Sequence, residues 1–336
     1  MSNDGKRRWA RTLRRLAIAL ASLFVILILG EIGLRVAGFE PDSGARLQRP
    51  WSVEDPELGW INRAGTHPST EPGEVLMTFR EDGRRAAGPL ERLAGQVKQT
   101  VVVVGCSFTQ GYGVRDDQTF AWLLDAAHPN VAFLNYGTGG YGTYQSMLAM
   151  VRAFEARETA PKAVVYGFVP FHASRNVQTV DYLMSLRSAG VTRRIAPHVR
   201  LEDGQLVPSA PGLMTKLPLA RHSALVALIY RRYLQVTFGD RMAQAETATM
   251  ALISRMRDLC DQNGSKLVVA ILDDESGGVD YRDLFSRSRI DFVDCANPDW
   301  PSEALRVGGV GHPNEVLHAE WAERIGRHLK EALATR

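Results

Sequence analysis

A serine at the end of a strongly apolar segment is the first residue whose position suggests chemistry. The run from Thr100 to Val104 (TVVVV) is followed by Gly105, Cys106 and Ser107. A continuous β-branched run is typical of a strand buried on both faces of a parallel sheet. Ligands bind beyond the carboxyl ends of such strands, so Ser107 lies where a nucleophile would be useful. A serine hydroxyl becomes an effective nucleophile only when an adjacent base accepts its proton.

This turn has other possible functions. Ser107 could equally be the N-cap of the helix that follows it. A phosphate-binding loop is excluded, because the turn lacks the GxxxxGK[ST] pattern and no lysine follows it. Nucleotide is therefore not an expected ligand. Cys106 is predicted to pack in the interior, since alternation along the strand end directs it away from Ser107.

A glycine-rich turn follows the next predicted strand, Val131 to Asn135. The turn contains Gly137, Gly139, Gly140 and Gly142. Acyl transfer generates an oxyanion that needs N–H donors already in place, and glycine allows the backbone to approach a reacting group closely. At least two of these glycines are expected to be plain turn formers.

These segments resemble the sequence blocks of the SGNH/GDSL hydrolases over residues 99–330. Residues 105–114 (GCSFTQGYGV) are similar to the nucleophile block GDSxTxG, with Cys106 in place of the usual aspartate. The turn after Asn135 is similar to the second block, and its spacing makes Gly140 the best match for the oxyanion glycine. Residues 311–314 (GHPN) precede the last predicted helix, as the catalytic histidine of the family does.

The resemblance implies a serine esterase or acylhydrolase. Ser107 would be the nucleophile and His312 its base, because an imidazole titrates near neutral pH. The N–H groups of Ser107 and Gly140 would form the oxyanion hole. No metal or organic cofactor is implied, and the three cysteines have no metal-like spacing.

The third block departs from the family pattern. The family places an asparagine after the third strand as a further oxyanion donor, whereas residues 169–176 here are VPFHASRN. Phe171 cannot donate, so His172 is the first substitute expected in the oxyanion hole and Asn176 the second. His172 could equally be a surface loop residue.

The orienting acid is also missing. The family has an aspartate three residues before the histidine, and Gly309 occupies that place. A backbone carbonyl could hold the imidazole instead, which would leave a serine–histidine dyad. The other candidates are four aspartates at or beyond predicted strand ends: Asp273, Asp274, Asp294 and Asp299.

Strand-like and helix-like segments alternate after residue 98. The strands are expected at Thr100–Val104, Val131–Asn135, Ala163–Val169, Lys266–Leu272 and Ile290–Cys295, and the helices at Thr119–Ala127, Tyr144–Arg157, Ala243–Asn263 and Asn314–Ala334. This alternation predicts a three-layer α/β/α sandwich with about five parallel strands, which is the flavodoxin-like SGNH fold. An insertion at about 172–240 interrupts it, and its segment Ser223–Phe238 could lie on a membrane surface or, more commonly, pack in the core.

The N-terminus predicts a membrane anchor. Residues 1–15 hold six basic residues against Asp4, a net charge of +5 that leaves −2 for the rest of the 336 residues. Residues 16–37 are predicted to span the membrane, with a cleaved signal peptide as the alternative. The positive-inside rule then leaves the tail in the cytoplasm and sends the C-terminal domain into the periplasm of a bacterium. A folded part so near neutrality excludes nucleic acid as a partner.

The predicted organisation is thus a tail (1–15), an anchor (16–37), a linker with a small irregular subregion (38–97) and a catalytic domain (98–336). The expected substrate is an acylated envelope glycan or lipid. Two alternatives stay open: an O-acyltransferase acting on a polysaccharide with the same residues, and a catalytically degenerate protein that binds or assembles glycans.

Overall fold

The computed structural model divides into two compact units. The first is formed by Met1–Arg46 with Thr215–Gly239, and the second by Leu47–Met214 with Asp240–Arg336. The first unit contains the helices α1 (Asn3–Val36) and α7 (Ala224–Phe238). The structure describes residues 3–41, 51–69, 75–88, 99–156, 159–188, 194–213, 217, 219–239, 241–275, 278–308 and 311–334.

A five-stranded parallel sheet forms the centre of the second unit. Its spatial order is β13-β12-β7-β5-β6, and every pairing in it is parallel. This order is the flavodoxin-like one, and it confirms the predicted fold. The strands are β5 (Gln99–Gly105), β6 (Val131–Asn135), β7 (Ala163–Phe168), β12 (Lys266–Ile271) and β13 (Phe292–Asp294).

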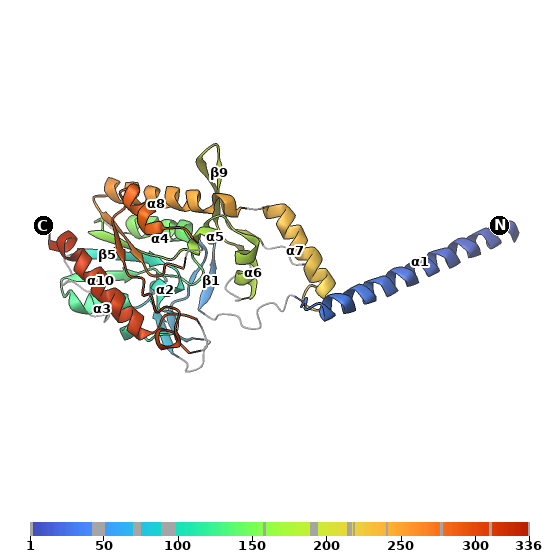
Figure 1. Cartoon of the computed structure of the whole chain (residues 1–336), viewed down its shortest axis with the longest axis horizontal. Coiled ribbons are helices and arrows are strands. Elements are labelled where there is room, and N and C mark those ends of the chain that lie inside the picture. The colour runs from blue at the N-terminus through green and yellow to red at the C-terminus, as the bar shows by residue number, and fades with distance from the viewer. Residues whose placement is uncertain are drawn as a thin grey trace. The chain divides into compact units, whose positions relative to one another are not determined.

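Helices cover both faces of this sheet, as Figure 1 shows. Successive side chains of a strand point to opposite faces, so β5 contributes Val102 and Val104 to one core and Val101 and Val103 to the other. The first core is closed by α4 (Thr143–Glu155), α8 (Ala245–Gln262) and α9 (Tyr281–Arg287). The second is closed by α3 (Phe120–Ala127) and α10 (Glu315–Ala334).

Short antiparallel pairs occupy the region before the sheet. Within its described residues, β1 (Ser52–Asp55) pairs with β2 (Gly59–Asn62), and β3 (Gly65–Pro68) pairs with β4 (Leu76–Phe79). Arg85 then bridges Phe79 on one side and Asn135, the last residue of β6, on the other. The region predicted to be a linker and an irregular subregion is therefore joined to the carboxyl end of the sheet.

The insertion after β7 contains helices and two further strand pairs. β9 (His198–Glu202) pairs with β10 (Gln205–Ser209), and β8 (Arg194–Ile195) with β11 (Gly212–Leu213). The helices of this segment in the second unit are α5 (His172–Asn176) and α6 (Val180–Ser188).

The strand order reverses direction at the carboxyl edge of the sheet. The chain passes from β5 outward to β6 and then returns to β7 on the other side of β5. In open α/β sheets, ligands bind beyond the strand ends at such a reversal of direction. The loops that follow β5, β6 and β7 therefore meet around a single position, and Ser107 follows β5.

Candidate active site

Ser107 lies at the first turn after β5. Gly105 has φ +155, a conformation that glycine adopts most readily, and Cys106 is the extended N-cap of the short helix α2 (Ser107–Gln110). Gly111 ends this helix in the left-handed conformation, with φ +74. The local sequence therefore makes a tight strand–turn–helix connection that holds Ser107 at the sheet edge, where it is 7% exposed.

His312 approaches this serine from the far end of the chain. Its Nε2 lies 3.0 Å from Ser107 Oγ, although 205 positions separate the two residues. The imidazole packs against the rings of Phe108 and Tyr112, at centroid distances of 5.8 and 4.9 Å. The N–H of Val307 donates to the His312 carbonyl at 2.8 Å and fixes the loop before α10. The structure thus places a base within hydrogen-bond distance of the candidate nucleophile.

The glycine-rich turn after β6 is bonded directly to β5. The N–H of Tyr136 donates to the Val103 carbonyl at 2.8 Å, and the N–H of Thr138 donates to the Gly105 carbonyl at 3.0 Å. Gly140 has φ +90, and its carbonyl accepts the Tyr182 hydroxyl hydrogen at 2.6 Å. Tyr182 therefore holds the carbonyl of Gly140, in the turn that the Thr138 N–H joins to the end of β5.

Gly137 shows how closely the two turns approach each other. A Cβ added there would lie 2.5 Å from the Gln110 nitrogen and 2.7 Å from the Thr109 carbonyl carbon. The Gly137 N–H also donates to the Asn135 side-chain oxygen at 2.9 Å, and the amide of Asn135 donates to the Thr109 carbonyl at the same distance. Only glycine fits at this contact between the nucleophile turn and the second block.

His172 is buried, and its ring has a defined hydrogen-bond partner. Its Nδ1 lies 2.7 Å from the Tyr166 hydroxyl, which itself donates to Thr143 at 2.8 Å. The hydroxyl hydrogen is thus used, so it is His172 that donates from Nδ1. The Nε2 atom then carries only a lone pair, and it has no partner among the described residues. Burial lowers the pKa of His172 well below its usual value, so the ring stays neutral. This tautomer offers no N–H to an oxyanion from Nε2.

Asn176 and Phe171 have other roles at this strand end. The Asn176 amide donates to Thr143 and Thr249, and its oxygen accepts the Tyr144 N–H at 3.1 Å, so its hydrogen-bonding capacity is used in the fold. Phe171 packs edge-on against Phe108 at a centroid distance of 5.7 Å. The residue that replaces the family's asparagine therefore forms part of an apolar wall beside the nucleophile turn.

A guanidinium and a thiol lie near this wall. Arg175 covers the Phe171 ring at 4.2 Å and donates to the Tyr141 carbonyl at 2.8 Å. Cys106 is completely buried, and burial raises the pKa of its thiol. A buried, protonated thiol is a poor nucleophile, which agrees with a packing role for Cys106.

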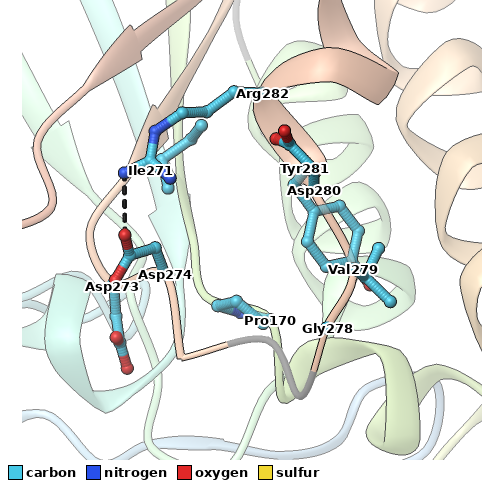
Figure 2. Close-up of a pocket in the computed structure, with 9 residues that line it drawn as sticks. All are labelled: Pro170, Ile271, Asp273, Asp274, Gly278, Val279, Asp280, Tyr281 and Arg282. Atoms are coloured by element: carbon cyan, nitrogen blue, oxygen red, sulfur yellow. Dashed lines mark hydrogen bonds and ion pairs between the residues drawn. The ribbon is translucent and has the colours of Figure 1, made fainter.

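Two of the four candidate acids for orienting His312 are paired with an arginine. Asp274 and Asp294 both accept from the Arg282 guanidinium, at 2.9 and 2.7 Å. Figure 2 shows the Asp274 contact at the wall of a cavity of about 280 Å³ beyond the carboxyl end of β12. Both carboxylates are therefore paired with Arg282.

Asp273 lies in the same cavity wall and is nearly completely buried. Its carboxylate accepts the Glu275 N–H at 3.0 Å and a hydrogen bond from the Trp300 side chain. Burial raises the pKa of this carboxyl. The backbone N–H of Asp299 donates to Asn297 in the turn before Trp300. Gly309 lies outside the described residues.

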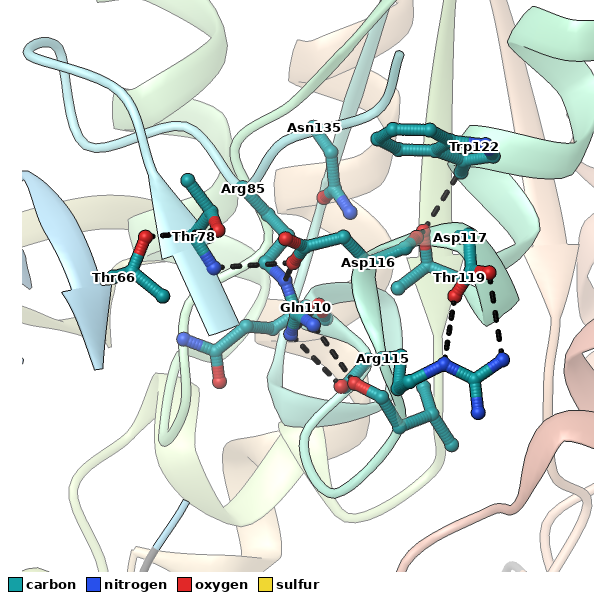
Figure 3. A network of polar contacts seen from close by, with 12 residues as sticks. Thr66, Thr78, Arg85, Gln110, Arg115, Asp116, Asp117, Thr119, Trp122 and Asn135 are labelled. Atoms are coloured by element: carbon teal, nitrogen blue, oxygen red, sulfur yellow. Dashed lines mark hydrogen bonds and ion pairs between the residues drawn. The ribbon is translucent and has the colours of Figure 1, made fainter. Parts of the chain in front are cut away.

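No sequence motif predicted the polar residues that hold the nucleophile turn from the other side. Arg85 is completely buried, and its guanidinium donates to the carbonyls of Gln110, Gly111 and Val114 at 3.2, 2.9 and 2.8 Å (Figure 3). Asn62 accepts the Gln110 amide at 2.7 Å and donates toward the Gly137 carbonyl at 3.3 Å. Both come from the region before the sheet, where no motif marked them.

Comparison with known proteins gave structural neighbours only. No family model matches the sequence, and no curated protein matches it by sequence. One neighbouring solved structure is a member of the lipolytic protein G-D-S-L family from Veillonella parvula, with 14% identity, coverage of 67% of this chain and 95% of that one, and a TM-score of 0.37.

Two further neighbours are esterases by their descriptions. EstA from Pseudoalteromonas is 11% identical, with coverage of 71% and 100% and a TM-score of 0.40. A catalytic mutant of Axe2, an acetylxylan esterase from Geobacillus stearothermophilus, is 12% identical, with coverage of 72% and 99% and a TM-score of 0.39. The solved structures named above are thus described as a lipolytic protein of the G-D-S-L family and as two esterases.

Proposed function

We propose that this chain is a membrane-anchored serine esterase that works through an acyl-serine intermediate. The observation that carries the proposal is the 3.0 Å contact between His312 Nε2 and Ser107 Oγ at the carboxyl edge of the sheet. The Ser107 oxygen bonds to the acyl carbon while its proton passes to His312. Collapse of the tetrahedral intermediate breaks the bond to the leaving oxygen, which takes that proton. Water then attacks the acyl-serine with His312 as base, and this step regenerates the serine.

The oxyanion of each tetrahedral intermediate needs N–H donors. We assign this role to the backbone N–H groups of Ser107 and Gly140, which belong to two turns joined by the Thr138–Gly105 hydrogen bond. His172 was the third expected donor, but the tautomer set by Tyr166 gives that role no support.

Ester hydrolysis by the purified full-length chain in detergent tests this function. Turnover of p-nitrophenyl acetate should fall by orders of magnitude in Ser107→Ala and in His312→Ala, and the double variant should lose little more, because nucleophile and base act as a unit. Ser174→Ala is the matched control, since among the described residues its hydroxyl donates to the Phe171 carbonyl and makes no contact with Ser107 or His312. Wild-type turnover in Ser107→Ala would show that another residue is the nucleophile.

A fluorophosphonate probe separates the alternatives. Labelling that depends on Ser107, together with hydrolysis, supports the esterase. Labelling without hydrolysis, but with acyl transfer to a sugar hydroxyl, identifies the O-acyltransferase. A protein that the probe does not label is the degenerate, glycan-binding form.

The proposed substrate is an acyl ester on an envelope glycan or lipid, because the chain carries one helix suited to anchor it at a membrane. Among the described residues, Arg7–Val36 is the one helix long and apolar enough to span a bilayer. With the basic tail in the cytoplasm, the catalytic unit would lie in the periplasm. A reporter enzyme that is active only outside the cytoplasm, fused after Arg336, should be active. Activity of a cytoplasm-only reporter at the same position would refute this orientation.

A further inference from the structure

The helix α7 is bound to the end of the predicted anchor by a single carboxylate. Glu31 accepts the Ser223 hydroxyl hydrogen at 2.8 Å and the N–H groups of Ala224 and Leu225 at 2.9 and 3.0 Å. Ser223 is the N-cap of α7, and the two N–H groups belong to its first turn, where N–H groups have no carbonyl partner within the helix. One residue of α1 therefore closes the N-terminus of α7.

A second side chain of α1 completes this clamp. Arg35 donates to Glu31 at 2.6 Å and to the His222 carbonyl at 2.8 Å. Both clamp residues lie in the last two turns of α1, where the apolar span ends. Figure 1 shows the start of α7 beside the C-terminal end of α1. If α1 crosses the bilayer, the clamp fixes the start of α7 at the level where the chain leaves the membrane.

Two opposite faces of α7 differ in their surroundings. Ala224, Tyr230 and Leu234 are buried. Ile229, Tyr233 and Val236 are 54%, 49% and 85% exposed, and their i, i+4, i+7 spacing puts them in one stripe on the opposite face. Leu225 and Val226 extend the stripe toward the clamp and are half-buried. A helix with one face already packed and a second apolar face exposed needs a further apolar partner.

The charges of α7 are of one sign. Arg231 and Arg232 are both exposed, and the helix contains no acidic residue. An apolar stripe combined with arginines is typical of a helix that lies in the plane of a membrane containing anionic lipid. The surface of α1 next to it is apolar and exposed along its span, so this unit already presents a lipid-facing surface.

We propose that α7 is a membrane-surface helix. Its stripe of Ile229, Tyr233 and Val236 inserts among the acyl chains, and its arginines contact phospholipid phosphates. Glu31 and Arg35 hold α7 at the C-terminal end of α1, where the anchor leaves the membrane. The proposal rests on α1 as the span, and it is independent of the esterase function. A second copy of the chain is the competing occupant of the stripe, but pairing two copies of α7 would bring their arginines together, whereas anionic lipid complements this charge.

The test uses the full chain reconstituted in vesicles of phosphatidylcholine and phosphatidylglycerol. Cys106, Cys260 and Cys295 are free but completely buried, so an introduced surface cysteine can be labelled selectively with an environment-sensitive fluorophore. Ile229→Cys and Val236→Cys report the stripe. Gln235→Cys is the matched control beside it, and Leu27→Cys in α1 reports insertion of the anchor.

The emission of labels at residues 229 and 236 should shift to shorter wavelength, and spin-labelled lipid should quench most of it. The label at residue 235 should keep its fluorescence. In the Val236→Cys background, Arg231→Gln with Arg232→Gln should reduce this loss in phosphatidylglycerol vesicles, and Glu31→Ala should reduce it in any vesicle.

Three outcomes overturn the proposal. The first is equal or absent quenching at residues 229, 235 and 236 while residue 27 is quenched. The second is a label at residue 27 that lipid does not quench, because the anchor is then not a span. The third is a label at residue 236 that is shielded from water but not quenched by lipid. If this shielding disappears when the protein is diluted in lipid, a second copy is the occupant.

Discussion

Arg85 Nε lies 2.7 Å from Asp116 Oδ1, and this ion pair joins the region before the sheet to the loop after the nucleophile turn. The arginine side chain is completely buried, whereas the aspartate is 21% exposed. The same guanidinium supplies hydrogen bonds to three carbonyls of the turn that begins at Ser107. Stability and the position of the nucleophile therefore depend on one side chain.

We expect Arg85→Met to lower the free energy of unfolding by about 3 kcal/mol, since it removes one partner of a largely buried pair. Turnover should fall as well, because the carbonyls of Gln110, Gly111 and Val114 lose their donors. The matched control is Arg115→Met, which breaks an exposed pair with Asp117 and should change stability by less than about 1 kcal/mol. Urea unfolding and p-nitrophenyl acetate turnover measure both effects. Equal stability losses in the two variants would contradict the structural role of Arg85.

A second prediction concerns the orientation of His312. Asp274 is committed to Arg282, so Asp274→Asn should keep turnover close to that of the wild type. Gly309→Asp should raise turnover, because a carboxylate in the family position would hold the productive tautomer of the imidazole. Steady-state kinetics of both variants, with melting temperatures as controls for folding, give the answer. A drop of about 10⁴ in Asp274→Asn at an unchanged melting temperature would instead make Asp274 the orienting acid.

The tautomer of His172 leads to a third prediction. Because Nε2 has a lone pair and no hydrogen, His172→Gln should lower the melting temperature through loss of the Tyr166 contact and leave kcat close to the wild-type value. Tyr166→Phe is the companion variant, since it removes the same hydrogen bond from the other partner. A fall of about 10²–10³ in kcat for His172→Gln alone, without destabilisation, would restore His172 as an oxyanion donor.

The fourth prediction is the pH dependence of stability. His318 is completely buried, and its Nδ1 accepts the Phe120 N–H at 3.2 Å. Burial, with a smaller effect from the charge of Arg85, lowers the pKa of His318 from 6.5 to about 3. Between these two pH values the unfolded chain binds a proton that the folded chain does not, so stability is lost as the pH falls. Above about pH 6.5 both states are neutral, and the contribution of His318 is flat.

The slope in that window should be about 1.4 kcal/mol per pH unit for one proton. His172, whose pKa is also lowered, adds to it with the same sign. His318→Gln keeps an acceptor for the Phe120 N–H and removes the titrating group. Its free energy of unfolding in urea should therefore fall less steeply than that of the wild type from about pH 6 to about pH 4, which lies between the two pKa values. Parallel curves for the two proteins would show that His318 does not control this acid sensitivity.

Local patterns in the sequence predicted the sheet and the helices α3, α4, α8 and α10 that cover it, whereas α9 was not predicted. The β-branched run before Gly105 depends only on neighbours along the chain, and such a run is compatible with few structures other than a strand buried on both faces. The same holds for the start of α3, where the Thr119 hydroxyl accepts the Trp122 N–H three residues later. The motif resemblance predicts Ser107 and His312 as nucleophile and base, although 205 positions separate them.

The partners of the other polar residues were decided only by the tertiary structure. Asn62 meets Gln110 across 48 positions, and Glu31 meets Ala224 across 193. Arg282, not His312, holds Asp274, and Tyr166 decides which nitrogen of His172 carries hydrogen. The type of a side chain determines what it can donate or accept, but its actual partner and its burial depend on which distant segments pack beside it.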